Sequence, residues 1–137
     1  MPCDASLKQL ATDYIDVYFI HYPSDSGIPI EDTMEGMMKL KEKGKIRAIG
    51  VSNFSKDQLI EARKYGEIDV IQPCYSLVWR FLDHEEMNYC IDNNIGIISY
   101  STLAQGILTG KFTKDTVFPS EDGRSRVPLF QSPHYEG

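Results

Sequence analysis

The chain has 137 residues, a length typical of one domain, and 42% hydrophobic and 25% charged residues, as in ordinary globular proteins. This composition excludes disordered and collagen-like chains, and no apolar run is long enough to cross a membrane. The formal net charge is -6, so we expect no nucleic-acid partner. The first ten residues lack the layout of a signal peptide, which predicts a cytoplasmic protein.

The three cysteines, Cys3, Cys74 and Cys90, are odd in number and widely spaced. This usage favours reduced thiols over a disulfide framework. No Cys/His pair has the spacing of metal ligands, so we expect no metal centre.

Four runs rich in β-branched and aromatic residues predict strands at 15–20, 46–51, 70–72 and 95–100, each buried on both faces. Helical periodicity lies between them. The first helix carries an apolar stripe from Ile30 to Met38, begins beside Pro29 and stops at Gly44.

The second and third helices are predicted from their amino-terminal signals. Ser55 and Gln58 have the spacing of a capping box, Phe54 and Leu59 that of a hydrophobic staple, and Gly66 ends the helix. The third helix has the same signature, with Asp83 and Glu86 as cap, Leu82 and Met87 as staple, and Asn94 with Gly96 as exit.

Strands and helices alternate with a period of roughly 25–30 residues, which predicts a parallel sheet and the α/β class. Residues 1–111 hold these units, whereas 112–137 lack periodicity and predict a long loop or a poorly ordered tail. No Gly-rich phosphate turn follows a predicted strand, which favours a barrel over a doubly wound sheet.

Polar residues follow the predicted strands: His21, then Ser52 with Asn53, then Gln72, then Tyr100. Each has a plain structural interpretation alone, since a single histidine more often packs or caps, and the others suit turns or strand ends. In a parallel barrel these ends meet at one face. Together they suit a flat, amide-bearing ring such as nicotinamide.

Four runs carry a family resemblance: DYIDVYFIHYP, GKIRAIGVSNF, IDVIQPCYSLVWR and ISYSTLAQGILTGK. In this order and spacing they resemble the aldo-keto reductase family, most of all its bacterial inositol-utilisation and stress-protein branch, and they are also similar to potassium-channel beta subunits. The resemblance extends to Lys111. It implies strands four to seven of a (β/α)8 barrel and NADPH-dependent reduction of aldehydes or ketones to alcohols, with NAD(H) as the alternative cofactor.

The resemblance also implies residue roles. His21 matches the active-site histidine that orients and polarises the carbonyl. The nicotinamide contacts would be Ser52, Asn53 and Gln72 at the carboxamide and Tyr100 stacked on the ring; the phosphate side would have Ser101, Leu103, Gln105 and Lys111, and the substrate pocket Tyr22, Tyr75 and Trp79. For Lys111 a solvated helix-end charge is the alternative, and for Trp79 and Tyr75 core packing or loop anchoring.

Family members also carry an aspartate, a tyrosine and a lysine ahead of the strand that ends in His21, and a cluster for the adenosine 2′-phosphate after the last run. Neither pattern occurs in this chain, so we expect an incomplete, inactive half barrel. Exposed sheet edges predict pairing with itself or with a complementary fragment, or aggregation. The alternatives are a non-catalytic nicotinamide-binding or regulatory module, and an unrelated α/β domain.

Overall fold

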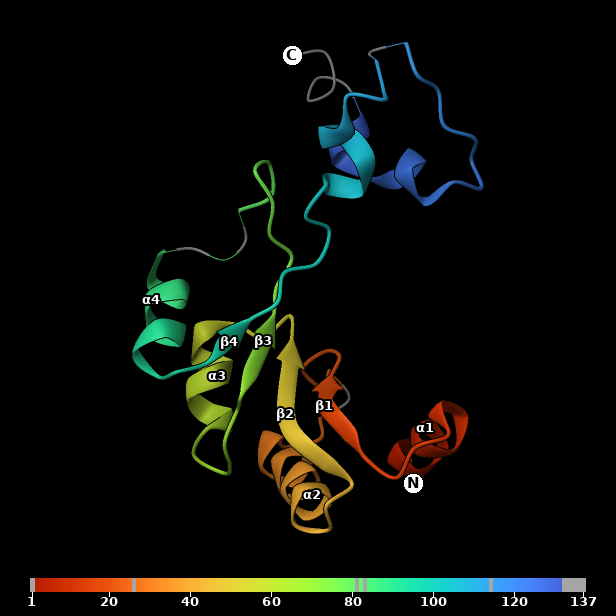
Figure 1. The fold of residues 1–137 in the computed structure, drawn as a ribbon. Helices are drawn as coiled ribbons and strands as arrows, with labels where there is room; N and C mark the ends of the chain where they lie inside the picture. Colours follow the sequence, from red (N-terminus) through yellow and green to blue (C-terminus); the bar gives the residue numbers. More distant parts are fainter. Residues whose placement is uncertain (1, 26, 81, 83, 114, 132–137) are drawn as a thin grey trace.

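The structure is a computed structural model that describes residues 2–25, 27–80, 82, 84–113 and 115–131. Four parallel strands form one sheet in the order β1-β2-β3-β4: β1 (Ile15–Ile20), β2 (Ile46–Ser52), β3 (Val70–Gln72) and β4 (Gly96–Ile97). Helices α2 (Ile30–Glu42), α3 (Lys56–Ala62) and α4 (His84–Asp92) connect consecutive strands, and α1 (Pro2–Leu10) precedes β1. The open parallel sheet in Figure 1 confirms the predicted α/β class.

Helix α2 follows the predicted apolar stripe, with Met34 and Met37 buried against the sheet. The helix ends at Glu42, and the predicted stop residue, Gly44, follows its cap in the left-handed conformation (φ 67°). The Gly44 N–H donates to Lys41 O at 2.9 Å, and the next N–H, of Lys45, donates to Leu40 O at 3.1 Å. This pair of bonds is a Schellman motif, which satisfies the last carbonyls and turns the chain into β2.

Helix α3 begins at the predicted capping box. The Ser55 hydroxyl accepts from the Gln58 N–H at 3.3 Å, and the Gln58 side chain accepts from the Ser55 N–H at 2.8 Å. The two staple residues, Phe54 and Leu59, are both buried in the core. The local sequence therefore fixes how the chain leaves β2 and enters α3.

The predicted end of α3 at Gly66 is wrong, because the helix ends at Ala62. The N–H of Lys64 bonds to Glu61 O and that of Tyr65 to Ala62 O, both at 3.1 Å and both three residues back. Such bonds tighten the last turn, so the chain leaves the α-helix before it reaches the glycine.

Helix α4 ends at Asp92, and the predicted exit residue Asn94 follows in the left-handed conformation (φ 53°). Its N–H donates to Ile91 O at 3.2 Å, and the Ile95 N–H donates to Cys90 O at 2.8 Å, a second Schellman motif. At the other end, Glu86 and Met87 lie in the first turns, whereas the predicted cap Asp83 is outside the described residues.

The predicted strand 95–100 is too long, since β4 covers only Gly96–Ile97. The chain nevertheless stays beside β3, because Ile98 N–H donates to Ile71 O at 3.0 Å and Tyr100 N–H donates to Pro73 O at 2.9 Å. Pro73 has no N–H of its own, which interrupts the ladder and leaves Cys74 and Tyr100 as a separate bridge.

The expectation that every strand is buried on both faces is also wrong. The row formed by Ile20, Val51 and Ile71 faces the helices, and Val51 and Ile71 are 0% and 1% exposed. In the next row, on the opposite face, Phe19, Gly50 and Val70 lie side by side, and the half-exposed Phe19 ring comes within 2.5 Å of where a Cβ on Gly50 would be. Helices cover only the first face, so this second, open face keeps apolar groups in contact with water.

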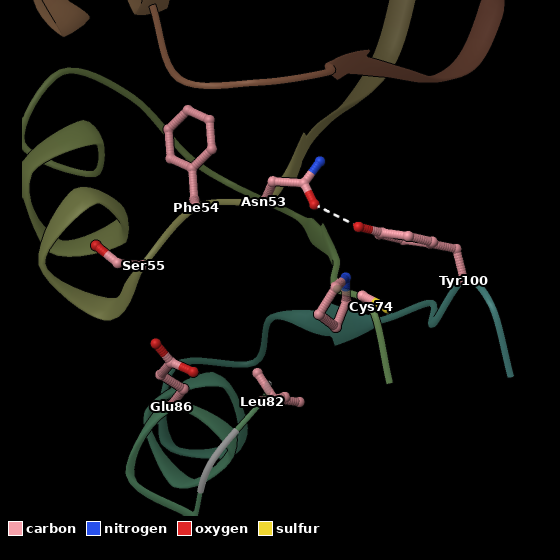
Figure 2. A pocket seen from close by; sticks show the side chains of 8 residues that line it. Asn53, Phe54, Ser55, Cys74, Leu82, Glu86 and Tyr100 are labelled. Atoms are coloured by element: carbon pink, nitrogen blue, oxygen red, sulfur yellow. Dashed lines mark hydrogen bonds between the residues drawn. The ribbon is translucent and has the colours of Figure 1, made fainter. Parts of the chain in front are cut away.

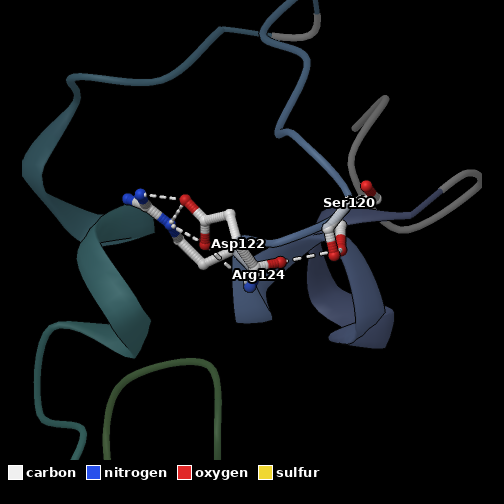
Figure 3. A network of polar contacts seen from close by, with 4 residues as sticks. Ser120, Asp122 and Arg124 are labelled. Atoms are coloured by element: carbon white, nitrogen blue, oxygen red, sulfur yellow. Dashed lines mark hydrogen bonds and ion pairs between the residues drawn. The ribbon is translucent and has the colours of Figure 1, made fainter.

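Beyond β4 lies a segment of short 3₁₀ helices: η1 (Ala104–Thr109), η2 (Gly123–Arg126) and η3 (Pro128–Phe130). Figure 1 shows this segment (blue) past the carboxyl ends of the strands. Three rings, Phe112, Phe118 and Phe130, pack edge to face with centroids 4.9–6.0 Å apart. Arg124 lies over the Phe118 ring and pairs with Asp122 (Figure 3). Across all described residues, no helix combines the length and the apolar character needed to span a membrane.

Candidate active site at the strand ends

Asn53, the residue after β2, joins the ends of several strands. Its Nδ2 donates to the backbone carbonyl of His21 at 3.0 Å and to the Ser52 hydroxyl at 3.1 Å. Its Oδ1 accepts from the Tyr100 hydroxyl at 2.7 Å (Figure 2). The Asn53 backbone is left-handed (φ 61°), a conformation that asparagine tolerates better than most residues. One side chain therefore connects the ends of β1 and β2 with the chain after β4.

The third strand is tied to the same place through Ser52 and Gln72. The buried Ser52 hydroxyl donates to the Gln72 backbone carbonyl at 2.7 Å, and the Asn53 N–H donates to that oxygen at 3.4 Å. Within the described part of the chain, the Gln72 side-chain amide makes no hydrogen bond. It thus leaves a donor and an acceptor available at the edge of the sheet.

His21 is exposed at the same edge and packs against Tyr22, with ring centroids 4.5 Å apart. Its backbone carbonyl, rather than its imidazole, makes the contact with Asn53. Among the described residues the imidazole makes no hydrogen bond, so it can meet a small molecule, while the main chain of His21 is anchored to the Asn53 side chain.

Two cavities meet at Tyr100 and Cys74. One, of 330 Å³, is bounded by Asn53 and Tyr100 on one side and by Glu86 on the other (Figure 2). The second, of 380 Å³, lies toward the carboxyl-terminal segment, and its wall includes Trp79, Ser101, Gln105 and Pro128. Tyr100 and Cys74 line both cavities and so form the partition between them.

Burial has the largest influence on the pKa values of Tyr100 and Cys74, the two residues of the partition. It raises the pKa of the Tyr100 phenol, and the nearby Cys74 and Tyr22 act in the same direction. Burial also raises the pKa of the Cys74 thiol, and its side-chain hydrogen bonds with Tyr100 and Ser101 oppose this effect. Both groups therefore stay neutral at physiological pH, and Cys74 lacks the thiolate character of a nucleophile.

The chain after Tyr100 is unusual in its backbone. Ser101, Ala104 and Gln105 all have φ near 50° (54°, 47° and 54°), and Gly106 follows at 99°. Non-glycine residues in this region cost of order 1–3 kcal/mol each and gather at functional sites. Leu103 and Lys111 are exposed, and neither lines the two cavities.

The structure thus brings together His21, Ser52, Asn53, Gln72 and Tyr100, and places Trp79, Ser101 and Gln105 around the neighbouring cavity. Sequence reasoning did not assign several residues that line these cavities, among them Cys74, Glu86 and Pro128. Cys74 is two residues after Gln72, so strand alternation was a signal for it. Pro128 comes from the non-periodic segment, where no sequence pattern pointed to it.

The parallel β/α units and the polar groups at the carboxyl ends of the strands define a part of a β/α-barrel protein. The sequence model described as "Aldo/keto reductase family" matches residues 1–132. The chain therefore belongs to this family of oxidoreductases, which confirms the resemblance seen in the sequence.

Curated relatives include aldo-keto reductase YhdN of Bacillus subtilis, 45% identical over 96% of this chain and 39% of its own length. The NADH-specific methylglyoxal reductase of Escherichia coli is 44% identical over 82% of the chain and 35% of its own length. This chain spans less than half the length of either relative.

Similar solved structures support the same family assignment. The glycerol dehydrogenase AKR11B4 from Gluconobacter oxydans superposes with a TM-score of 0.92 at 38% identity, covering 98% of this chain and 41% of the other. An aldo/keto reductase from Klebsiella pneumoniae in complex with NADP and acetate gives a TM-score of 0.70 at 32% identity, over 83% of this chain and 41% of its own. The predicted partial barrel is thereby confirmed.

Proposed function

We propose that residues 1–137 form the nicotinamide-binding half of an NAD(P)H-dependent reductase that converts aldehydes or ketones into alcohols. The observation that carries this proposal is the Asn53 side chain, hydrogen-bonded to the His21 carbonyl and to the Tyr100 hydroxyl. It gathers an imidazole, carboxamides and an aromatic ring at one edge of the sheet. When bound, the dinucleotide supplies the hydride for carbonyl reduction.

The residues present fit a nicotinamide. Its ring needs a flat apolar surface, which Tyr100 offers at the partition between the cavities, and its carboxamide needs both a donor and an acceptor. The unpaired Gln72 amide provides both among the described residues, and Oδ1 of Asn53 keeps one lone pair. Ser52 acts by holding the Gln72 backbone in place.

His21 acts on the substrate in this proposal. Its exposed imidazole donates a hydrogen bond that orients and polarises the carbonyl, with Tyr22 and Trp79 shaping the substrate pocket. On the other side of Tyr100, the polar groups of Ser101 and Gln105 and the charge of Lys111 face the phosphates, with Leu103 as an apolar contact. We propose NADP(H) as the cofactor and NAD(H) as the alternative, because one structural relative is in complex with NADP and one sequence relative is NADH-specific.

Cofactor binding tests the proposal directly. NADPH and NADH are titrated into the purified chain and followed by nicotinamide fluorescence, in parallel with Gln72→Ala and with Gln9→Ala on exposed α1 as a matched control. We expect Gln72→Ala to weaken binding about 5- to 10-fold, the value of one or two hydrogen bonds, and the control to match the unmodified chain. Equal affinity of all three proteins would contradict the assignment.

Turnover is a separate test. We expect the 137-residue chain alone to show negligible NADPH oxidation with a nitrobenzaldehyde, because a positioned general acid contributes roughly 100- to 10,000-fold and His21 alone of the family's tetrad is matched in it. Robust turnover that His21→Ala abolishes would refute this expectation. Cofactor binding without turnover, together with capture of a specific protein partner, would favour a regulatory module.

The open face of the sheet supports a proposal about assembly. Phe19 and Val70 are half-buried there and Ile98 is 50% exposed, while β1 and β4 are the edges of the sheet. Apolar surface and unpaired strand edges favour association. We therefore expect self-association at micromolar concentration, and sedimentation as a single stable monomer would contradict it.

A further inference from the structure

We propose that the hydroxyl of Tyr100 is a positioning group: its hydrogen bond to Asn53 Oδ1 holds the phenol ring flat against the site that the nicotinamide occupies. The inference rests on the proposed function, and it goes further by giving a role to an atom that stacking alone does not use. We call this hydrogen bond the strut. It joins the residue that stacks on the ring to a residue that holds the carboxamide.

The direction of the strut is fixed by its neighbours. The His21 backbone carbonyl can only accept, so the amide nitrogen of Asn53 must face it, at 3.0 Å. The second N–H of that nitrogen is directed to the Ser52 hydroxyl at 3.1 Å. Oδ1 must then face Tyr100, whose hydroxyl donates its proton at 2.7 Å. Asn53 is thus held on three sides and is a rigid support for the strut.

The Tyr100 backbone is fixed as well. Its N–H donates to Pro73 O at 2.9 Å, and its carbonyl accepts from Tyr75 N–H at 3.2 Å. Among the described residues, the polar contacts of the side chain at its far end are those of the hydroxyl with Asn53 and with the Cys74 thiol. Without the hydroxyl, the ring keeps its apolar area but is free to turn between the two cavities that it separates.

A ring that is already in place loses less conformational freedom when a ligand stacks on it, which favours affinity. Removal of the strut should therefore weaken the binding only of ligands that contain a nicotinamide ring. We expect about a fivefold loss, the factor of one net hydrogen bond. Ligands that carry only the adenosine and phosphate groups should be unaffected.

The experiment compares the full 137-residue chain with Tyr100→Phe and with Tyr65→Phe, a control that removes an exposed hydroxyl in contact with Glu61 of α3. Each protein is titrated with NADPH, with reduced nicotinamide mononucleotide and with ADP, whose diphosphate meets the proposed phosphate side. The expected result is fivefold weaker binding of the first two ligands to Tyr100→Phe, unchanged ADP binding, and no effect of the control.

A second variant separates the strut from general damage. In Asn53→Gly the acceptor is lost while the left-handed backbone is kept without strain, so Tyr100→Phe should have no further effect in that background. Additive losses, an equal loss for ADP, or no loss for the nicotinamide ligands would overturn the strut while the binding function stands. Failure of the unmodified chain to bind NADPH and reduced mononucleotide would overturn the proposed function, and the strut with it.

Discussion

The sheet with its helices and the segment from 104 to 131 are built on different principles. In the sheet, apolar residues recur with the period of each element and fill one continuous core that includes Met34, Ile49 and Leu59. In the segment, three phenylalanine rings and the Asp122–Arg124 pair hold short 3₁₀ turns together. The first region distributes its stability over many contacts, whereas the second depends on a few.

This difference predicts how far the effect of a mutation should extend in each region. A core shared by β1–β3 and α2–α4 should fail as a unit, because its residues contact one another across all of these elements. The segment has its own small aromatic cluster and should open locally, without loss of the sheet.

Leu59→Ala should have the largest effect. Leu59 is fully buried in α3, so truncation removes buried apolar area and leaves a cavity, with an expected loss of about 3–4 kcal/mol in the free energy of unfolding. Urea denaturation followed by circular dichroism measures it. The neighbouring Ile60 is 39% exposed, and Ile60→Ala should change stability by less than about 1 kcal/mol. Equal effects would remove the distinction between core and surface on this helix.

Phe130→Ala should destabilise the segment from 104 to 131 without destabilising the sheet. Phe130 is buried and contacts both other rings of the cluster, and we expect a local loss of about 2–3 kcal/mol. Limited proteolysis should then cleave 112–131 faster while the urea transition of the sheet is unchanged. Val117→Ala, at an 88% exposed position, is the control. A drop in the global transition would show that the two regions are one cooperative unit.

Ser55→Ala should weaken the sheet by about 1 kcal/mol, the usual effect of a lost helix cap. Urea midpoints give the value, and Ser6→Ala on exposed α1 is the matched serine control. Since Ser55 lies two residues after Asn53, the same variant should also lower NADPH affinity. An unchanged midpoint would mean that packing of Phe54 and Leu59 alone starts the helix.

The smallest expected effect is that low pH destabilises the segment from 104 to 131. Arg124 lowers the pKa of the Asp122 carboxyl from 3.8 to about 2 by hydrogen bonding. For a lowered pKa, the stabilisation is complete above the unfolded value and is lost as pH falls from about 4 through about 2. Ring-proton NMR shifts of Phe118, beneath Arg124, should move in this window and stay constant in Asp122→Asn. The core signals should not follow.

Local signals in the sequence were sufficient for most of the sheet. The Ser55 capping box, the Gly44 exit and the stripe from Ile30 to Met38 are written in neighbouring residues, and all three were confirmed. The ends of the strands were harder to predict from the sequence. The ladder after β4 breaks because Pro73 on the adjacent strand lacks an N–H, and no pattern within 95–100 contains that information.

The residues of the site could be predicted from the sequence, but the hydrogen bonds between them could not. His21, Asn53, Gln72 and Tyr100 could be grouped because parallel strands end at one edge. That Asn53 binds the backbone of His21 and the hydroxyl of Tyr100 could not, since it depends on the exact path of three separate chain segments. The aromatic cluster of the segment has the same character: its rings are 6 to 18 positions apart without a period.

The backbone and the hydrogen bonds at position 53 together leave little freedom for substitution. The left-handed backbone (φ 61°) accepts few side chains, chiefly glycine, asparagine and aspartate. Glycine would leave the His21 carbonyl and the Tyr100 hydroxyl without their partner, and aspartate would set a second acceptor against the His21 carbonyl. Glutamine has the same polar atoms on a side chain that is one methylene longer, which would move them away from these two partners. In a saturation library, the wild-type residue should be the lone survivor of a selection for cofactor binding.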